Sequence, residues 1–119
     1  LCALAAKPER IHKLFNTVEV SPEGKYSINI CVNGIWQAVV VDDCLPVHPG
    51  TNNLAFGKYL KEDQKGVLWV ALIEKAWAKL NGNYDRIVLG SVDLGYIHLC
   101  GVPSVGYKHK TFFNENARL

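Results

Sequence analysis

The segment that decides the fold runs over residues 68–84 and reads LWVALIEKAWAKLNGNY. Its apolar residues recur with the spacing of one helix face: Trp69, Leu72, Ile73, Ala76 and Leu80. The charged residues take the opposite face: Glu74, Lys75 and Lys79. Gly82 follows where a left-handed residue commonly ends a helix. The sequence therefore predicts an amphipathic helix over 68–80, with Trp69 and Trp77 in the core and the charged face in solvent.

The residues ahead of this helix alternate with a period of two, which is typical of strands. Residues 25–32 (KYSINICV) and 35–42 (IWQAVVVD) flank Asn33-Gly34, a pair that favours a type I′ hairpin turn because both positions need positive φ. Ser-Pro-Glu-Gly at 21–24 indicates a second turn. We therefore expect a three-stranded antiparallel meander: Thr17–Val20, Lys25–Val32 and Ile35–Asp42.

The remaining segments predict short elements. Apolar spacing interrupted by Pro8 predicts one helix that ends near Ala6 and a second from Pro8 to about Phe15. A loop is expected over 43–53, a short strand over 54–56, an exposed polar segment over 58–66 and a short helix over 93–100. The expected class is α+β, with helices packed beside a small antiparallel sheet. Because Leu1 lies within an apolar helical pattern, we expect the sequence to be an excerpt.

The composition is that of a globular domain, with 49% hydrophobic and 20% charged residues. The formal net charge is +2 and no basic stripe occurs, so no nucleic-acid partner is expected. The longest apolar run, Val67–Ile73, is too short for a transmembrane segment. The cysteines form no CxxC pair and favour buried, reduced thiols in a cytoplasmic protein. They are Cys2, Cys31, Cys44 and Cys100.

Four residues have the right chemistry for zinc: Cys44, His48, His98 and Cys100. Their spacing does not match that of a zinc knuckle. The favoured alternative is two core thiols, one loop histidine and one histidine packed on a helix.

Two further groups contain residue types that enzymes use in catalysis, but their sequence neighbours favour a structural role. Asp42 and Asp43 are adjacent in a strand, so their carboxylates point to opposite faces and do not form a catalytic dyad. We favour a role in which one aspartate accepts a backbone N–H in the following turn over a metal or catalytic role. Cys2 lies near a helix start, where a thiolate is stabilised, but its flanks are apolar and favour a packing thiol.

Several motifs, in order, resemble the calpain family of papain-like cysteine proteases. LCALA at 1–5 followed by PERI at 8–11 resembles the helix after that family's nucleophile. GIW at 34–36 with VVVDDCLP at 39–46 resembles its GxWxxVVVDDxLP hairpin. Residues 68–84 resemble its WxxLLEKAYAKLxGSY helix, and LCG at 99–101 falls where the family often has LTG. The resemblance covers the chain except its last dozen residues, and it implies part of a papain-like fold.

The resemblance implies a cytosolic, calcium-regulated cysteine endopeptidase that cleaves protein substrates. Residues 1–88 would be part of the first core subdomain, after the nucleophile, and 89–119 the start of the second. The nucleophilic cysteine is then expected just before Leu1, and the histidine and asparagine beyond Leu119, so no catalytic residue is predicted within this chain. The first alternative is a catalytically inactive homologue that acts as a protein-binding module. The second is an unrelated α+β binding domain.

The resemblance implies one contact with the substrate in this chain, at Gly90, which is followed by Ser91. A glycine lets an extended peptide approach the main chain closely. A simple turn glycine is the equally weighted alternative, because glycine so often serves in turns. Leu89 stands where the family usually has a further glycine, so the local backbone is expected to differ from the family's. The family's acidic calcium ligand corresponds to Val67, which cannot bind a hard cation. Calcium in the whole protein therefore has no predicted ligand in this chain, and the family's site in this subdomain is expected to be altered or absent.

Overall fold

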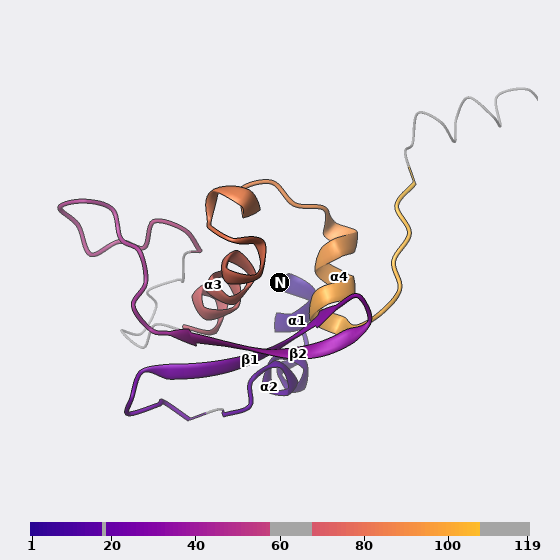
Figure 1. Cartoon of the computed structure of the whole chain (residues 1–119), viewed down its shortest axis with the longest axis horizontal. Helices are drawn as coiled ribbons and strands as arrows, with labels where there is room; N and C mark the ends of the chain where they lie inside the picture. The colour runs from indigo at the N-terminus through magenta and orange to yellow at the C-terminus, as the bar shows by residue number, and fades with distance from the viewer. Residues whose placement is uncertain (18, 58–67, 108–119) are drawn as a thin grey trace, which may run out of the picture.

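The computed structural model describes residues 1–17, 19–57 and 68–107. Figure 1 shows two strands surrounded by short helices. The elements are α1 (Cys2–Ala5), α2 (Pro8–Leu14), β1 (Lys25–Val32), β2 (Ile35–Asp42), α3 (Trp69–Asn81), the 3₁₀ helix η1 (Asp85–Ile87) and α4 (Val92–Cys100). The expected class, helices beside a small antiparallel sheet, is confirmed. The polar segment expected over 58–66 and the calcium-ligand position Val67 lie outside the described residues.

The hairpin forms as the Asn33-Gly34 pair predicts. β1 and β2 are antiparallel, with Val32 opposite Ile35 and Lys25 opposite Asp42. Asn33 and Gly34 have φ of 52° and 79°, the positive values that a type I′ turn requires. A two-residue turn of this kind fixes the register, so the apolar residues of both strands reach the same face.

The third strand expected over Thr17–Val20 is wrong for the residues described there, which exclude Val18. The backbone pairs with the sheet at an isolated bridge between Phe15 and Ile28, beside which the Asn16 N–H donates to the Ser27 carbonyl at 3.1 Å. Asn16 adds a side-chain hydrogen bond to the Ser27 hydroxyl, and beyond it the described residues form no further ladder with β1. Similarly, the short strand expected over 54–56 is an isolated bridge between Val47 and Leu54.

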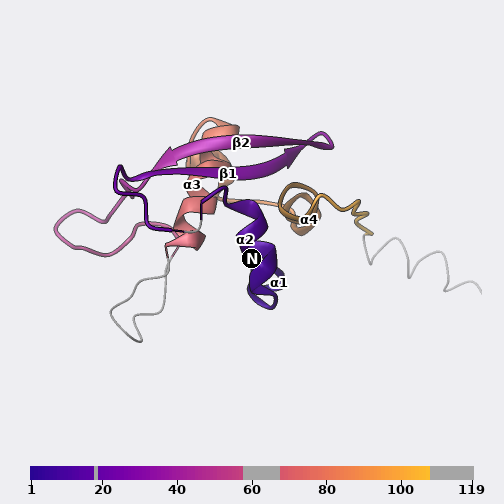
Figure 2. The same ribbon diagram turned by 90° about the horizontal axis from the view of Figure 1, so that it is seen from below.

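The core lies between the hairpin and the helices. Figure 2 shows α1, α2 and α4 on one side of the strands. Ile28 and Ile30 of β1 are both 0% exposed, and alternate residues of the strand share their face. The buried cluster contains Leu4, Leu14, Tyr26, Ile28, Ile30, Val39, Val41, Leu72, Ile73 and Ala76. One continuous core therefore joins the first two helices, the hairpin and α3.

The apolar face of α3 is close to the expected one. Trp69 and Trp77 pack against the core but are only partly buried. Leu80, expected on the apolar face, is 39% exposed because it lies in the last turn, beyond the strands. Gly82 caps the helix with φ of 103°, a positive value as expected.

The charged face of α3 is not simply solvated, which corrects the sequence-based expectation. Lys75 Nζ donates to Asp42 Oδ1 and to the Cys44 carbonyl oxygen, both at 2.5 Å. Lys79 Nζ donates to the Val40 carbonyl at 2.7 Å. The long lysine side chains reach past the helix to the sheet edge, so this face connects α3 to β2 and to the loop after it.

The helix expected over 93–100 forms as α4, although none of its residues is fully buried. Gly101 ends it in the left-handed conformation, and its N–H donates to the Ile97 carbonyl at 2.9 Å. Trp36 of the hairpin lies directly against this glycine, 2.7 Å from where a Cβ would stand. Within the described residues, no helix is long and apolar enough to cross a membrane.

Candidate functional site

Gly90 and Ser91 lie between η1 and α4, at the start of the helix. Both residues are exposed. The φ of Gly90 is not in the positive region, and nothing lies within 4 Å of where its Cβ would stand. The fold itself therefore accepts a side chain here, so neither a special backbone conformation nor packing within the described chain requires a glycine.

The residues around this glycine are apolar and exposed. Val88, Leu89 and Val92 are 69%, 91% and 76% exposed. Ser91 is the N-cap residue of α4 with extended backbone, and its side chain makes no capping hydrogen bond. The segment 88–92 thus presents open main chain with apolar side chains on either side of it, which is the surface an extended peptide needs.

This segment follows a well-fixed corner at the end of α3. The Phe56 and Tyr84 rings stack with centroids 4.3 Å apart and planes 10° apart. The Gly57 N–H donates to Glu74 Oε2 at 2.6 Å, which binds the loop to α3 next to that stack. The Arg86 N–H donates to Asn83 Oδ1 at 3.0 Å. These contacts fix the chain up to η1, immediately before the exposed segment.

Asp42 has the role favoured from the sequence, as a turn acceptor at the strand end. Its Oδ1 accepts the Cys44 N–H at 2.8 Å. The hydrogen bond from Lys75, and then that from the Cys44 backbone, lowers the pKa of this carboxyl below its ordinary 3.8. Asp43 instead lies beside Gly24, 2.6 Å from where a Cβ of that residue would stand. The two carboxylates do not act as a pair.

Tyr84 is the second titratable group with a shifted pKa. Burial raises the pKa of its phenol above 10.0, and the nearby carboxylates of Glu74 and Asp42 raise it further. The hydroxyl therefore stays protonated at neutral pH and serves the packing of this corner.

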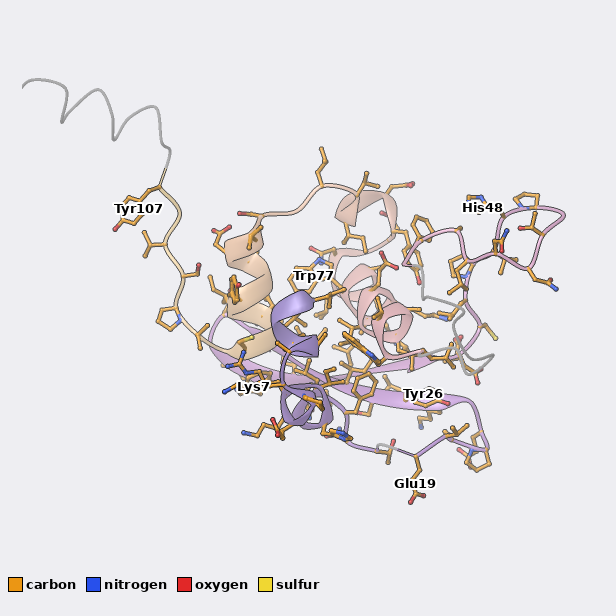
Figure 3. The ribbon with its side chains drawn as sticks, turned by 180° about the vertical axis from the view of Figure 1, so that it is seen from behind. Lys7, Glu19, Tyr26, His48, Trp77 and Tyr107 are labelled. Atoms are coloured by element: carbon orange, nitrogen blue, oxygen red, sulfur yellow. The ribbon has the colours of Figure 1, made fainter. Side chains whose placement is uncertain are left out.

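The four residues considered for zinc are not brought together. His48 lies on the loop after β2, which Figure 3 shows projecting away from the helices. His98 and Cys100 belong to α4, on the opposite flank in Figure 1. Among the residues that the structure describes, no three His, Cys, Asp or Glu side chains are grouped as metal ligands. The described part of the chain therefore does not gather the four zinc candidates into one site.

No described thiol is paired with an imidazole in the manner of a catalytic dyad. Cys31 is buried, Cys100 is half-buried and Cys44 is exposed, and all three are free of disulfides. His98 uses its Nδ1 on the Leu94 carbonyl at 2.7 Å and meets Trp77 edge to face at 4.5 Å. The expectation of buried thiols is thus wrong for Cys44, which follows the strand end into a loop. The side chain of Cys2 lies outside the described part.

A cavity of about 820 Å³ opens between the first two helices, the hairpin and α4. Its wall combines aromatic, basic and aliphatic residues: Leu4, Arg10, Lys13, Leu14, Asn29, Trp36, Tyr96, Leu99, Cys100 and Val102. Sequence reasoning missed it because five elements contribute to it and no local motif marks it. The sequence indicated this cavity only by placing a large aromatic residue, Trp36, directly after Gly34 and Ile35, next to an exposed turn.

Comparison with known proteins agrees with this architecture. The family model described as "Calpain family cysteine protease" matches residues 1–117. The chain is 36% identical over 100 residues to "Calpain-type cysteine protease DEK1" of Arabidopsis thaliana, covering 83% of this chain and 4% of that protein. It is 32% identical over 109 residues to "Calpain-10" of Rattus norvegicus, covering 85% of this chain and 16% of that relative. With "Calpain-7" of Homo sapiens, the identity is 41% over 68 residues, 56% of this chain and 8% of the relative. The chain therefore spans a small part of these relatives' length, and it belongs to the calpain family of cysteine proteases.

Proposed function

We propose that this chain is structural framework and substrate-binding surface in the catalytic core of a calpain-type cysteine endopeptidase. Residues 1–88 form part of the first subdomain and 89–119 begin the second, with the segment after η1 as the junction. The nucleophilic cysteine and its histidine and asparagine partners come from other parts of the protein. Family membership supports this reading.

The observation that carries the proposal is the open space around Gly90. A glycine that neither its own backbone conformation nor its neighbours require leaves its main chain open to a partner that approaches from outside. An extended substrate fits, because its main chain would pair with the exposed backbone of Gly90 and Ser91. The apolar side chains of Val88, Leu89 and Val92 would contact alternate substrate side chains.

The first experiment is a fluorogenic peptide assay on the whole protein, with and without calcium. We expect turnover that a cysteine-blocking reagent abolishes. Turnover that survives the reagent contradicts the assignment to cysteine proteases, and complete lack of turnover favours the inactive homologue that binds proteins. Because the Val67 side chain offers no oxygen to a hard cation, we propose that the family's calcium site in this subdomain is altered or absent. Free thiols at Cys31, Cys44 and Cys100 support a reducing location such as the cytoplasm.

The second experiment tests Gly90 itself. Gly90→Val should lower kcat/KM by about tenfold, because a Cβ branch blocks the approach of the substrate and removes about one main-chain hydrogen bond. Gly106→Val is the matched control, since nothing lies within 4 Å of that position either and it is not at the proposed contact. Equal kcat/KM values for the two variants would refute the substrate contact and leave the endopeptidase assignment intact.

A further inference from the structure

Two asparagines in the chain are followed directly by a glycine, Asn33 by Gly34 and Asn81 by Gly82. In such a pair the backbone nitrogen of the glycine can attack the side-chain amide carbon of the asparagine, because a glycine has no side chain to obstruct the approach. The attack closes a succinimide ring and releases ammonia. Water then opens the ring at either carbonyl and leaves aspartate or isoaspartate. How the fold holds each pair therefore decides whether it reacts.

The fold leaves the Asn33-Gly34 pair open to this reaction. Both residues are exposed, and nothing lies within 4 Å of where a Cβ of Gly34 would stand. Within the described chain, neither the Asn33 side chain nor the Gly34 N–H takes part in a hydrogen bond. Ring closure needs a rotation about the Asn33 backbone, so the hairpin tip must open locally. Ile35 and Trp36 beside it are 67% and 51% exposed, so few buried contacts oppose that opening.

Asn81 provides a comparison within the same chain. It is exposed as well, but its Nδ2 donates to the Trp77 carbonyl at 2.8 Å. Asn81 is also the last residue of α3, and the Arg86 side chain lies 3.7 Å from where a Cβ of Gly82 would stand. A reaction at this pair must break the side-chain hydrogen bond and unwind the end of the helix. The fold therefore favours Asn33 over Asn81.

The isoaspartate product would change the turn between the strands. Its main chain runs through the former side chain, so the backbone between residues 33 and 34 becomes one methylene longer. A two-residue type I′ turn fixes the register of its hairpin, and a longer backbone does not fit that geometry. Trp36 lies just beyond the turn and contacts Gly101 at the end of α4. A change at the tip therefore reaches the contact that helps to hold α4.

We propose that Asn33 is a site of spontaneous deamidation and that its isoaspartate product loosens the attachment of α4 to the hairpin. The new bond joins the Gly34 nitrogen to the Asn33 Cγ, and the bond that breaks releases the amide nitrogen. The Gly34 nitrogen gives its proton to solvent base, and the leaving nitrogen takes one from water to become ammonia. Water is the co-reactant in the second step. The proposal rests on the hairpin and does not depend on the substrate contact at Gly90.

Peptide mapping by mass spectrometry tests the site, on the whole protein incubated at mildly alkaline pH. We expect deamidation at Asn33 to be at least about tenfold faster than at Asn81, because the Asn33 amide has no hydrogen bond to break. A synthetic peptide of residues 30–37 gives the rate of the same pair without the fold. Equal rates at the two asparagines, or an inert Asn33 over the time in which the peptide reacts, would overturn the proposal.

Asn33→Gly is the matched variant for the effect on α4, since Gly-Gly also favours a type I′ turn and has no amide to lose. After incubation, the isoaspartate fraction of the parent should show faster amide hydrogen exchange in α4, and Asn33→Gly should show no change. Asn81→Ala should age as the parent does. Unchanged exchange of α4 in the isoaspartate fraction, or the same acceleration in Asn33→Gly, would refute the link between the turn and this helix.

Discussion

Lys75 shows how a single residue acquires a role that its helix position does not reveal. Its place on the polar face of α3 indicates only that it points away from the core. In the fold its side chain is 20% exposed and its Nζ contacts Asp42 and the Cys44 carbonyl. Periodicity identifies the face of a residue but not the element that this face meets, so these contacts could not be derived from the sequence. The turn role of Asp42 could be, because it is local.

The Asp42–Lys75 pair makes stability depend on acid pH. The hydrogen bond from Lys75 lowers the folded-state pKa of Asp42 below 3.8, so the contribution of its charge is present above that value and is lost as pH falls through the folded-state pKa. Asp42→Asn keeps the acceptor and removes the charge. We expect it to melt slightly below the parent at pH 7, with the difference closing below pH 3.8. Thermal melts between pH 2 and 7 measure this.

Asp43→Asn is the control for the acid titration, because that side chain forms no ion pair in the described fold. Comparing the two variants separates loss of the Lys75 contact from loss of one carboxylate at this strand end. A gap for Asp42→Asn that stays constant down to pH 2 would contradict the coupling to Lys75. The magnitude should be small, since the Asp42 side chain is 62% exposed and solvent screens the pair.

Tyr84 should make stability fall at alkaline pH. Because burial raises its folded-state pKa above 10.0, the protonated phenol stabilises the fold below that pH, and this contribution is lost as pH rises through the folded-state pKa. Tyr84→Phe keeps the stack on Phe56 and should flatten the loss of stability above pH 10. Tyr84→Ala should cost about 1 kcal/mol at pH 7 from the ring pair alone. Urea unfolding at pH 7 and pH 11 separates the two effects.

If the parent and Tyr84→Phe lose the same stability between pH 7 and pH 11, ionisation of the Tyr84 phenol is not the cause of that loss. Ultraviolet absorbance at 295 nm gives an independent check. The absorbance change above pH 10 should be smaller in the variant than in the parent.

At the scale of elements, the hairpin and α3 could be derived from sequence because each has a signal in its own residues. Asn33-Gly34 dictates the turn, and the spacing of apolar residues dictates α3. The third strand failed because strand pairing depends on partners distant in sequence. Thr17 and Val20 have residue types that favour a strand. In the fold the Asn16 side chain hydrogen-bonds the Ser27 hydroxyl, and Val20 is 86% exposed. Gly90 and Ser91 were placed by resemblance, and their exposure could be known only from the fold.

Two glycines that flank the strands provide a matched test of the hairpin. Gly24 and Gly34 have φ of 63° and 79°, so alanine at either costs about 1 to 2 kcal/mol of backbone strain. At Gly34 nothing lies within 4 Å of the new Cβ, whereas at Gly24 the Asp43 carboxylate lies 2.6 Å away. Gly24→Ala should therefore destabilise more than Gly34→Ala in urea unfolding. Equal losses would mean that the Asp43 side chain moves aside freely.

At the scale of the whole molecule, the described core is uneven. α1, α2, the hairpin and α3 contribute its buried residues, while α4 contributes only the partly buried Leu99 and Cys100. α4 is attached through these residues, through Trp36 against Gly101 and through the ring contact of His98 with Trp77. Few buried apolar contacts mean a low free energy of local opening. The helix that follows the proposed substrate contact is therefore less firmly held than α3.

Native-state hydrogen exchange should show this difference directly. We expect the amides of α4 to exchange through local opening, at a free energy well below the global value that governs α3 and the hairpin. Gly101→Ala should lower the protection of α4 further, because the residue has φ of 64° and its Cβ would stand 2.7 Å from the Trp36 ring. The amides of α3 should keep their protection in this variant, since Gly101 is not part of the core cluster. If α3 and α4 instead lost protection together, the two would form one cooperative unit, and the proposed boundary between residues 88 and 89 would have no basis in stability.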